Sequence, residues 1–249
     1  MLETQALTIR FGGHAAVDGV SCAFQPGTLT SIVGPNGAGK TTYFNLISGQ
    51  LPSTSGKVLL NGQDITRTPA PHRTRLGLGR AFQLTNLFPN LTALENVRLA
   101  VQVKSGKSLH LFSRTSTHRE LADRARDYLA AVSMSERADT VAATLPHGDQ
   151  RKLEVAILLA LEPDIFMFDE PTAGMSIDDV PTVLDAIAAI KQRGDKTILL
   201  VEHKMDVVRS LSDRIVVLHQ GKLVGDGTPA EVINSDIVRE AYLGGAPDA

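Results

Sequence analysis

The sequence has 249 residues, 43% of them hydrophobic, which is enough to bury the core of one domain. Its formal net charge of −2 lacks the strong positive field of a dedicated nucleic-acid-binding protein, so we expect no nucleic-acid partner. The single cysteine, Cys22, excludes an internal disulfide and is expected to be buried in its apolar run. No apolar run approaches the roughly 18 residues of a membrane-spanning helix, so we expect a cytoplasmic protein that reaches a membrane only through a partner.

The N-terminal part of the sequence alternates short β-rich runs with turns. Three strands are predicted, over residues 6–11, 20–24 and 29–33. A helix is expected to start at Lys40 and to end near Gly49. The apolar run 58–60 and the turn Asn61-Gly62 then predict an antiparallel hairpin.

Residues 91–150 change to helical spacing, which is clearest at Leu121, Ala125, Leu129 and Val132. We interpret this segment as an inserted helical subdomain. The basic, Ser/Thr-rich stretch 104–119 is interpreted as a solvated connecting loop rather than a phosphate-binding patch, because no strand precedes its glycine.

The rest of the sequence alternates helices with apolar strands, a pattern typical of a mostly parallel sheet covered by helices. The predicted elements are helices over 151–161 and 179–191, strands over 165–168 and 197–201, a hairpin of 214–219 with 223–224 across Gln220-Gly221, and a helix start capped by Thr228, Pro229 and Glu231. Because no internal repeat is found, we expect one α/β domain over residues 1–249. Its core would be 1–90 and 151–249, with an antiparallel β part, and its helical subdomain 91–150.

The most specific motif lies between an apolar strand and a helix, the context in which G-x-x-x-x-G-K-[ST] binds phosphate. Its residues are Gly34, Pro35, Asn36, Gly37, Ala38, Gly39, Lys40 and Thr41. The glycines let backbone N–H groups surround phosphate oxygens at the positive end of the helix. Lys40 would contact the β and γ phosphates, and the Thr41 hydroxyl would bind Mg²⁺. The motif therefore predicts a nucleoside triphosphate site.

Polar residues follow two of the later apolar strands. Asp169 and Glu170 end the first of them, where Asp169 would hold Mg²⁺ and Glu170 would act as general base on the attacking water. Two acids at this place are also compatible with a simple turn or helix cap, and the preceding phosphate-binding motif favours the catalytic interpretation. His203 follows the next strand and is expected to contact the γ-phosphate. The absence of Asn-Lys-x-Asp argues against a GTPase.

These motifs together resemble the ATP-binding subunits of ABC transporters, and the resemblance extends from about Leu2 to Gly244. It implies the ABC type of P-loop NTPase fold, with ATP and Mg²⁺ as ligands. It further implies that Phe11 stacks on adenine, that Val17 and Thr42 also contact the nucleotide, and that Gln83 senses Mg²⁺ and contacts the membrane subunit. Asp169 and Glu170 match the paired acids of the family, and His203 matches its switch histidine.

One segment occupies the place of the family's Leu-Ser-Gly-Gly-Gln signature, which contacts the nucleotide held by the opposite subunit. Its residues are Leu145, Pro146, His147, Gly148, Asp149 and Gln150. Pro146 replaces the serine, and Asp149, which stands where glutamine is usual, is expected to cap the following helix. A degenerate signature with poor catalysis is the alternative interpretation. Ser176 likewise stands where an acid is common.

Within the family, FGGHAAVDGV, LPHGDQRKLEVA and AYLGG are markers of the ATPases of branched-chain amino-acid importers and of their urea and amide relatives. This resemblance implies a subunit on the inner face of the cell membrane. Its partners would be permease subunits, a second ATPase in a homodimer or heterodimer and, indirectly, a solute-binding protein. Two alternatives stay open: a soluble ABC ATPase of DNA repair or translation, and a poorly hydrolytic regulatory subunit.

Overall fold

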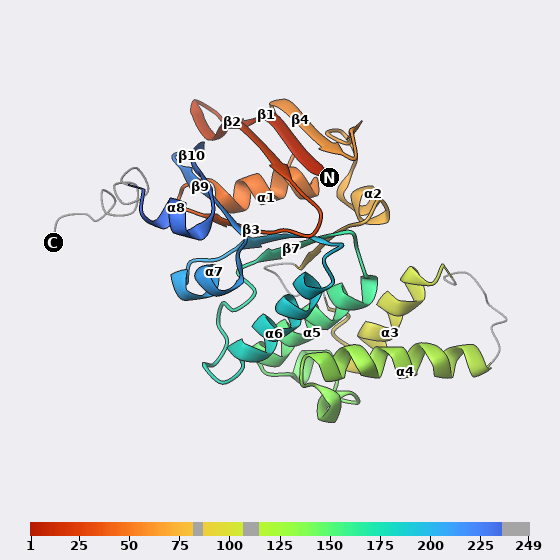
Figure 1. Ribbon diagram of the computed structural model, residues 1–249. Coiled ribbons are helices and arrows are strands. Elements are labelled where there is room, and N and C mark those ends of the chain that lie inside the picture. Colours follow the sequence, from red (N-terminus) through yellow and green to blue (C-terminus); the bar gives the residue numbers. More distant parts are fainter. Residues whose placement is uncertain (82–86, 107–114, 236–249) are drawn as a thin grey trace. The chain divides into compact units, whose positions relative to one another are not determined.

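The structure is a computed structural model that describes residues 1–81, 87–106 and 115–235 (Figure 1). Gln83, residues 107–114 of the basic stretch and the AYLGG ending lie outside the described residues. The chain forms two compact units, one of residues 1–78, 164–170 and 191–249 and one of residues 79–163 and 171–190. The segment 91–150, expected to be helical, lies within the second unit.

The N-terminal part of the first unit is an antiparallel sheet in the order β2-β1-β4-β5. Its strands are β1 (Leu2–Phe11), β2 (His14–Phe24), β4 (Ser55–Leu60) and β5 (Gln63–Asp64). The predicted hairpin at Asn61-Gly62 is confirmed, and both turn residues have the positive φ, 51° and 80°, that a two-residue turn needs. β1 and β2 begin earlier than predicted, because register shifts between them break the strict alternation that marks a strand in sequence.

A second sheet of the first unit has the order β10-β9-β3-β8-β7. Its strands are β3 (Leu29–Val33), β7 (Ile165–Asp169), β8 (Thr197–Val201), β9 (Arg214–His219) and β10 (Lys222–Gly227). β3 runs parallel to both β8 and β9, β7 runs parallel to β8, and β10 returns antiparallel to β9. Every residue of β3, β7 and β8 is buried, as expected of strands covered on both faces. The predicted mostly parallel sheet is confirmed.

The helices of the first unit are α1 (Lys40–Ser48), α2 (Ala70–Arg75), α7 (Met205–Leu211) and α8 (Pro229–Ile233). Tyr43, Phe44 and Ile47 of α1 are fully buried and pack in the core of this unit. α1 is followed by Gly49, whose φ of 78° is the left-handed conformation usual after a helix. α8 begins with the predicted capping box of Thr228 and Glu231.

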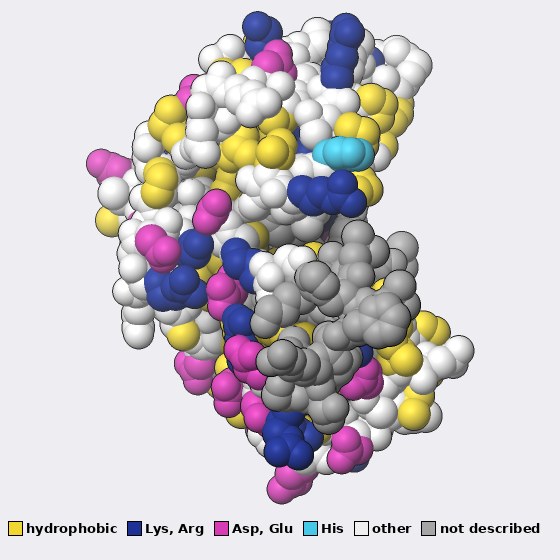
Figure 2. Space-filling model, turned by 90° about the vertical axis from the view of Figure 1, so that its right-hand side faces the viewer, with side chains coloured by type: hydrophobic (Ala, Val, Ile, Leu, Met, Phe, Trp, Pro, Cys, Tyr) yellow, Lys and Arg dark blue, Asp and Glu magenta, His cyan; other side chains and the backbone are white. Residues whose placement is uncertain are grey.

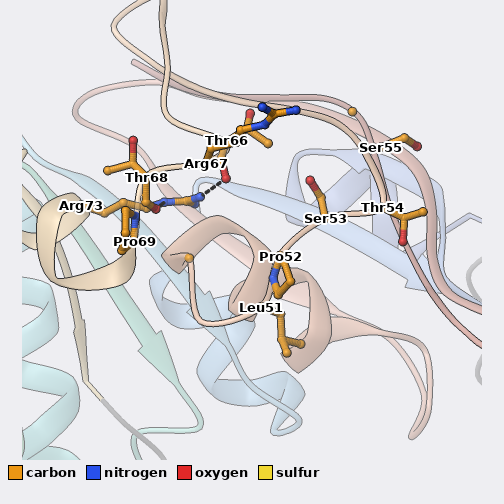
Figure 3. A pocket seen from close by; sticks show the side chains of 12 residues that line it. Leu51, Pro52, Ser53, Thr54, Ser55, Thr66, Arg67, Thr68, Pro69 and Arg73 are labelled. Atoms are coloured by element: carbon orange, nitrogen blue, oxygen red, sulfur yellow. Dashed lines mark hydrogen bonds between the residues drawn. The ribbon is translucent and has the colours of Figure 1, made fainter.

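The side chain of Arg73 in α2 caps the C-terminal end of α1. The residue is 1% exposed, and its guanidinium donates hydrogen bonds to the carbonyls of Leu46 and Ile47 at 2.8 and 2.6 Å. It also donates to the carbonyls of Thr66 and Thr68, and Figure 3 shows it in the wall of a cavity of about 520 Å³. Burial lowers the pKa of Arg73 to about 10. A cation here is favourable because the last carbonyls of a helix carry partial negative charge.

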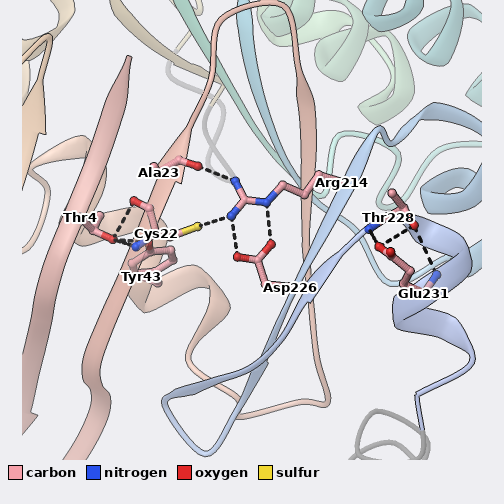
Figure 4. A network of polar contacts seen from close by, with 8 residues as sticks. All are labelled: Thr4, Cys22, Ala23, Tyr43, Arg214, Asp226, Thr228 and Glu231. Carbon is pink, nitrogen blue, oxygen red and sulfur yellow. Dashed lines mark hydrogen bonds and ion pairs between the residues drawn. The ribbon is translucent and has the colours of Figure 1, made fainter.

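Arg214, the first residue of β9, connects the two sheets of the first unit (Figure 4). Its guanidinium forms two hydrogen bonds of 2.6 Å with Asp226 of β10 and donates to the carbonyl of Ala23 in β2. It also lies 3.5 Å from the sulfur of Cys22. Burial raises the pKa of Cys22 to about 11, so this thiol is protonated at neutral pH. The predicted burial of Cys22 is confirmed.

The second unit is mainly helical. It contains α3 (Ala93–Lys104), α4 (Thr115–Ala131), α5 (His147–Leu161), most of α6 (Val180–Gln192), the short 3₁₀ helices η1 (Ser135–Arg137) and η2 (Ala142–Thr144), and the last three residues of β6 (Leu78–Ala81). Leu121, Ala125 and Leu129 of α4 are buried, which confirms the predicted helical spacing. Among the described residues, no helix is both long enough and apolar enough to span a membrane.

On the face drawn in Figure 2, acidic and basic side chains lie interspersed.

Candidate functional site

The loop between β3 and α1 adopts a conformation that only glycine permits at two positions. Gly34 has a φ of 151°, and a Cβ placed on it would lie 2.1 Å from the carbonyl oxygen of Leu218. Gly39 has a φ of 96°, and a Cβ there would lie 2.3 Å from the carbonyl oxygen of Ala16. Both neighbours are backbone atoms, so neither can rotate away. The loop is therefore held tightly against β9 and β2 while it leads into the N-terminus of α1.

Lys40 opens α1 and turns its ammonium group back into this loop. The residue is 6% exposed, and its Nζ donates to the carbonyl oxygens of Gly34 at 2.7 Å and Pro35 at 2.9 Å. Burial lowers the pKa of Lys40, and the nearby carboxylates of Glu170 and Asp169 partly oppose this effect. A partly desolvated cation at this place gains strongly from an incoming phosphate oxygen.

Two acidic residues lie where β7 ends. Asp169 is the last residue of β7 and is 2% exposed. Glu170 follows with a φ of 50°, a left-handed conformation that is strained for a side chain of this kind, and its N–H donates to the carbonyl of Val201 at 2.9 Å. This left-handed backbone at Glu170 ends the extended geometry of β7 directly after Asp169.

His203 meets Glu170 at the same edge of the sheet. β7 and β8 are parallel neighbours with Asp169 opposite Val201, so the residues that follow them lie side by side. His203 Nε2 lies 2.7 Å from Glu170 Oε1. Side chains 33 residues apart are thus brought into one hydrogen bond beside the phosphate-binding loop.

A cavity of about 220 Å³ brings most of the predicted nucleotide residues together. Its lining consists of Ala16, Asn36, Gly37, Ala38, Gly39, Lys40, Thr41, Thr42, Glu170 and His203. The sequence analysis did not predict Ala16 as a lining residue. It directly precedes the predicted Val17, and successive side chains of a strand such as β2 point to opposite faces. Val17 itself is fully buried in the core, and Phe11 is 53% exposed at the end of β1 and is not part of this lining.

The residues at this site fit a magnesium nucleotide chemically. The Thr41 hydroxyl, in the cavity lining, and the Asp169 carboxylate, at the end of β7 and outside that lining, are hard oxygen ligands of the kind that Mg²⁺ prefers. The loop leads into the N-terminus of α1, where backbone N–H groups are available to a phosphate, and a Cβ on Gly37, at a φ of 79°, would meet nothing within 4 Å. Gln83, the third predicted Mg²⁺ residue, lies outside the described residues.

The signature segment forms the start of α5 in the second unit. Leu145 is 4% exposed, and the side chain of Gln150 donates to its carbonyl at 3.0 Å. This hydrogen bond links the last residue of the segment to its first. The prediction that Asp149 caps this helix is wrong. α5 already begins at His147 with Pro146 as N-cap, so Asp149 lies in the first helical turn. Its carboxylate instead pairs with Lys152 at 3.3 Å, one turn further along the same face.

Lys152 also pairs with Asp179 and so joins the signature segment to the loop that contains Ser176. The Ser176 hydroxyl donates to Asp179 Oδ2 at 2.6 Å. Burial would lower the pKa of Lys152, but hydrogen bonds to Asp179 and Asp149 outweigh it, and the pKa is raised. Hydrogen bonds from Lys152 and Ser176 lower the pKa of Asp179. Sequence reasoning missed this ion-pair cluster, for which the Asp149-to-Lys152 spacing was the only available signal.

Known proteins resemble this chain along most of its length. Residues 17–173 match the family model described as "ABC transporter", and residues 222–248 match the one described as "Branched-chain amino acid ATP-binding cassette transporter". The chain is 39% identical over 251 residues to the high-affinity branched-chain amino acid transport ATP-binding protein LivG of Escherichia coli (strain K12), with 99% of this chain and 98% of the relative covered.

Two solved structures extend the likeness to the fold. One is the ADP conformation of an ATP-binding cassette of an ABC transporter, with a TM-score of 0.81, 27% identity and 98% of each chain covered. The other is a dimeric ATP-binding cassette in a post-hydrolysis state bound to ADP and Pi, with a TM-score of 0.79, 26% identity, and 92% of this chain and 99% of that chain covered. The chain therefore belongs to the ABC transporter family and, within it, to the branched-chain amino acid ATP-binding cassettes.

Proposed function

We propose that this chain binds MgATP in the cavity of the first unit, hydrolyses it, and powers an importer of branched-chain amino acids or related small polar solutes. The observation that carries the proposal is the Glu170–His203 hydrogen bond of 2.7 Å in a cavity that also holds Lys40 and Thr41. A carboxylate, an imidazole and a phosphate-binding lysine in one cavity supply a general base, its orienting partner and a charge for the triphosphate.

Each residue has a defined part in this proposal. The loop amides and Lys40 hold the β and γ phosphates, while Thr41 and Asp169 would hold Mg²⁺. Bound Mg²⁺ would neutralise charge on the phosphate oxygens. Glu170 accepts a proton from the water whose oxygen bonds to the γ-phosphorus as the bond to ADP breaks. His203 keeps the Glu170 carboxylate directed at this water.

The proposed partners follow from the family. We infer a head-to-tail dimer with a second copy or a sister ATPase, in which the signature of one subunit reaches the nucleotide held by the other. The dimeric solved cassette supports this arrangement. The subunit would bind hydrophobic permease subunits at the inner face of the membrane, and a solute-binding protein would act through them. The name of the LivG relative, a branched-chain amino acid transport ATP-binding protein, supports a branched-chain amino acid as cargo.

Purification of the tagged chain from detergent-solubilised membranes of its native cells, followed by mass spectrometry, tests the partners. We expect two permeases and a second ATPase. In proteoliposomes containing that complex, the solute-binding protein loaded with leucine should stimulate ATP hydrolysis, while the same protein offered arginine should not. Recovery only from the soluble fraction, with ribosomes or DNA-repair proteins, would overturn the transporter proposal and favour the soluble ABC ATPase.

A further inference from the structure

The turn between β9 and β10 contacts two segments that line the nucleotide cavity. The N–H of Gly221 donates to the carbonyl of Ala38 in the phosphate-binding loop at 3.0 Å. The carbonyl of Gly221 accepts from the N–H of Asp18 in β2 at 2.8 Å. Ala38 lines the cavity, and so does Ala16, two residues before Asp18. A single residue some 180 positions from the loop therefore ties both segments together.

The backbone of Gly221 lies too close to β2 to leave room for a side chain. Gly221 has a φ of 77°, and a Cβ on it would lie 2.9 Å from the carbonyl oxygen of Ala16 and 3.1 Å from that of Ala15. The Cα of Gly221 is in turn only 3.5 Å from where a Cβ on Gly39 would lie. The turn, β2 and the phosphate-binding loop thus pack backbone against backbone.

β9 supports the loop at its other end as well. The carbonyl oxygen of Leu218 lies directly behind Gly34, at the point where the loop leaves β3. Leu218 thus contacts the first glycine of the loop, and Gly221 contacts its last turn before α1. Support at both ends matters because phosphate binding depends on backbone N–H groups that already point at the ligand, so less ordering is needed on binding.

We propose that Gly221 is a positioning residue for nucleotide binding, which fixes the phosphate-binding loop against β2 through its own two backbone groups. This inference rests on the proposed ATP site. Displacing the turn would turn the amide groups near Ala38 away from the phosphates, while Glu170 and His203, which follow other strands, keep their places. The effect should therefore appear in nucleotide affinity far more than in the rate of the saturated enzyme.

Gly62 supplies a matched control. It is the second residue of the Asn61-Gly62 hairpin turn, with a φ of 80°, and it follows a residue with a φ of 51°. Gly221 likewise follows Gln220, whose φ is 48°. The two glycines carry the same conformational demand, but a Cβ on Gly62 would meet nothing within 4 Å. Gly62→Ala therefore reproduces the backbone strain of Gly221→Ala without the contact to β2.

The test is a titration of the full-length protein with a fluorescent ATP analogue in the presence of Mg²⁺, together with KM, kcat and thermal unfolding. For Gly221→Ala we expect Kd and KM to rise about tenfold, the equivalent of 1.4 kcal/mol, with kcat within about twofold. For Gly62→Ala we expect a similar fall in Tm and an unchanged Kd. Wild-type binding in the same titration checks the ATP site itself, so a failure of the proposed function is seen separately.

Asparagine variants keep the test decisive if Gly221→Ala does not fold. Asparagine tolerates positive φ, so it relieves the backbone strain at either position but keeps the Cβ. We expect Gly62→Asn to behave like wild type in both stability and Kd, and Gly221→Asn to bind nucleotide weakly. The proposal is overturned if the Gly221 variants bind with wild-type Kd, or if the Gly62 variants weaken binding equally.

Discussion

Glu170 and His203 share a hydrogen bond of 2.7 Å although they follow different strands of the parallel sheet. The bond exists because β7 and β8 end together, with Asp169 opposite Val201, and because the Glu170 N–H bonds to the Val201 carbonyl. The positive φ of Glu170 then directs its side chain toward the cavity rather than along the strand. The proposed general base and its proposed orienting partner are thus positioned by backbone pairing of the sheet.

Substitution Glu170→Gln should separate nucleotide binding from hydrolysis. The amide keeps the shape of the side chain but cannot accept the proton of the attacking water, so kcat should fall at least about 100-fold. The Kd for MgATP should stay within about threefold, because Lys40 and the loop amides are unchanged. Phosphate release and nucleotide titration measure the two quantities. Glu136→Gln, at an exposed position of η1, is the control, and a Glu170→Gln protein with normal turnover would refute the general-base assignment.

Substitution of His203 should act through Glu170. His203→Ala removes the group 2.7 Å from Glu170 Oε1, and we expect kcat to fall roughly 10- to 100-fold from loss of orientation. His203→Gln should recover part of this loss, since its amide can donate a hydrogen bond to the carboxylate. In a Glu170→Gln background, removing His203 should cost little more, because residues that act as a unit are not additive. Additive losses would show that His203 acts independently of Glu170.

Much of this site is predictable because its chemistry is local in sequence. The phosphate-binding loop is a continuous motif, and Asp169, Glu170 and His203 each follow a recognisable apolar strand. Parallel strands bring such residues to one edge, so the fold class predicts that Glu170 and His203 lie at the same edge of the sheet, while their hydrogen bond depends on the pairing of β7 with β8. The hairpins at Asn61-Gly62 and Gln220-Gly221 are predictable for the same reason, since turn type depends on two residues.

Features that depend on tertiary contacts are not predictable in this way. Register shifts between β1 and β2 decide that Ala16 rather than Val17 lines the cavity, and nothing in the local pattern marks them. Asp149 suits an N-cap by composition, but it lies in the first turn of α5, where it pairs with Lys152. The bond between Gly221 and Ala38 joins segments distant in sequence, so no local rule reveals it.

Arg73 should contribute strongly to stability, because its removal takes a charged donor away from the carbonyls of Leu46 and Ile47 at the buried end of α1. For Arg73→Met we expect a loss of about 3 kcal/mol in the free energy of unfolding, from hydrogen bonds made by a charged group. Arg67 lines the same cavity but is exposed, so Arg67→Met should change stability by no more than about 0.5 kcal/mol (Figure 3). Urea unfolding measures both variants. Equal losses would mean that the carbonyl contacts of Arg73 are not the cause.

The Lys152–Asp179 ion pair should make stability depend on pH in the acidic range. Hydrogen bonds from Lys152 and Ser176 hold the pKa of Asp179 below its ordinary value, so the folded state favours the carboxylate. This contribution is fully present above the ordinary pKa of about 3.9 and is lost as the pH falls through the lower folded-state value. Asp179→Asn should therefore cost about 1 kcal/mol at neutral pH and progressively less below about pH 4.

A double-mutant cycle identifies Lys152 as the partner in this effect. Urea unfolding of wild type, Asp179→Asn, Lys152→Met and the double variant, at pH 7 and at about pH 3, gives the coupling energy at each pH. Lys152 remains charged throughout this range, and Asp149 is the same in all four proteins. The pH dependence of the coupling energy is therefore assigned to the Asp179 carboxylate. We expect a favourable coupling at pH 7 that is largely lost at the acidic pH. A cost of Asp179→Asn that is the same at both pH values, or the same without Lys152, would show that the ion pair does not stabilise the contact between the signature segment and the Ser176 loop.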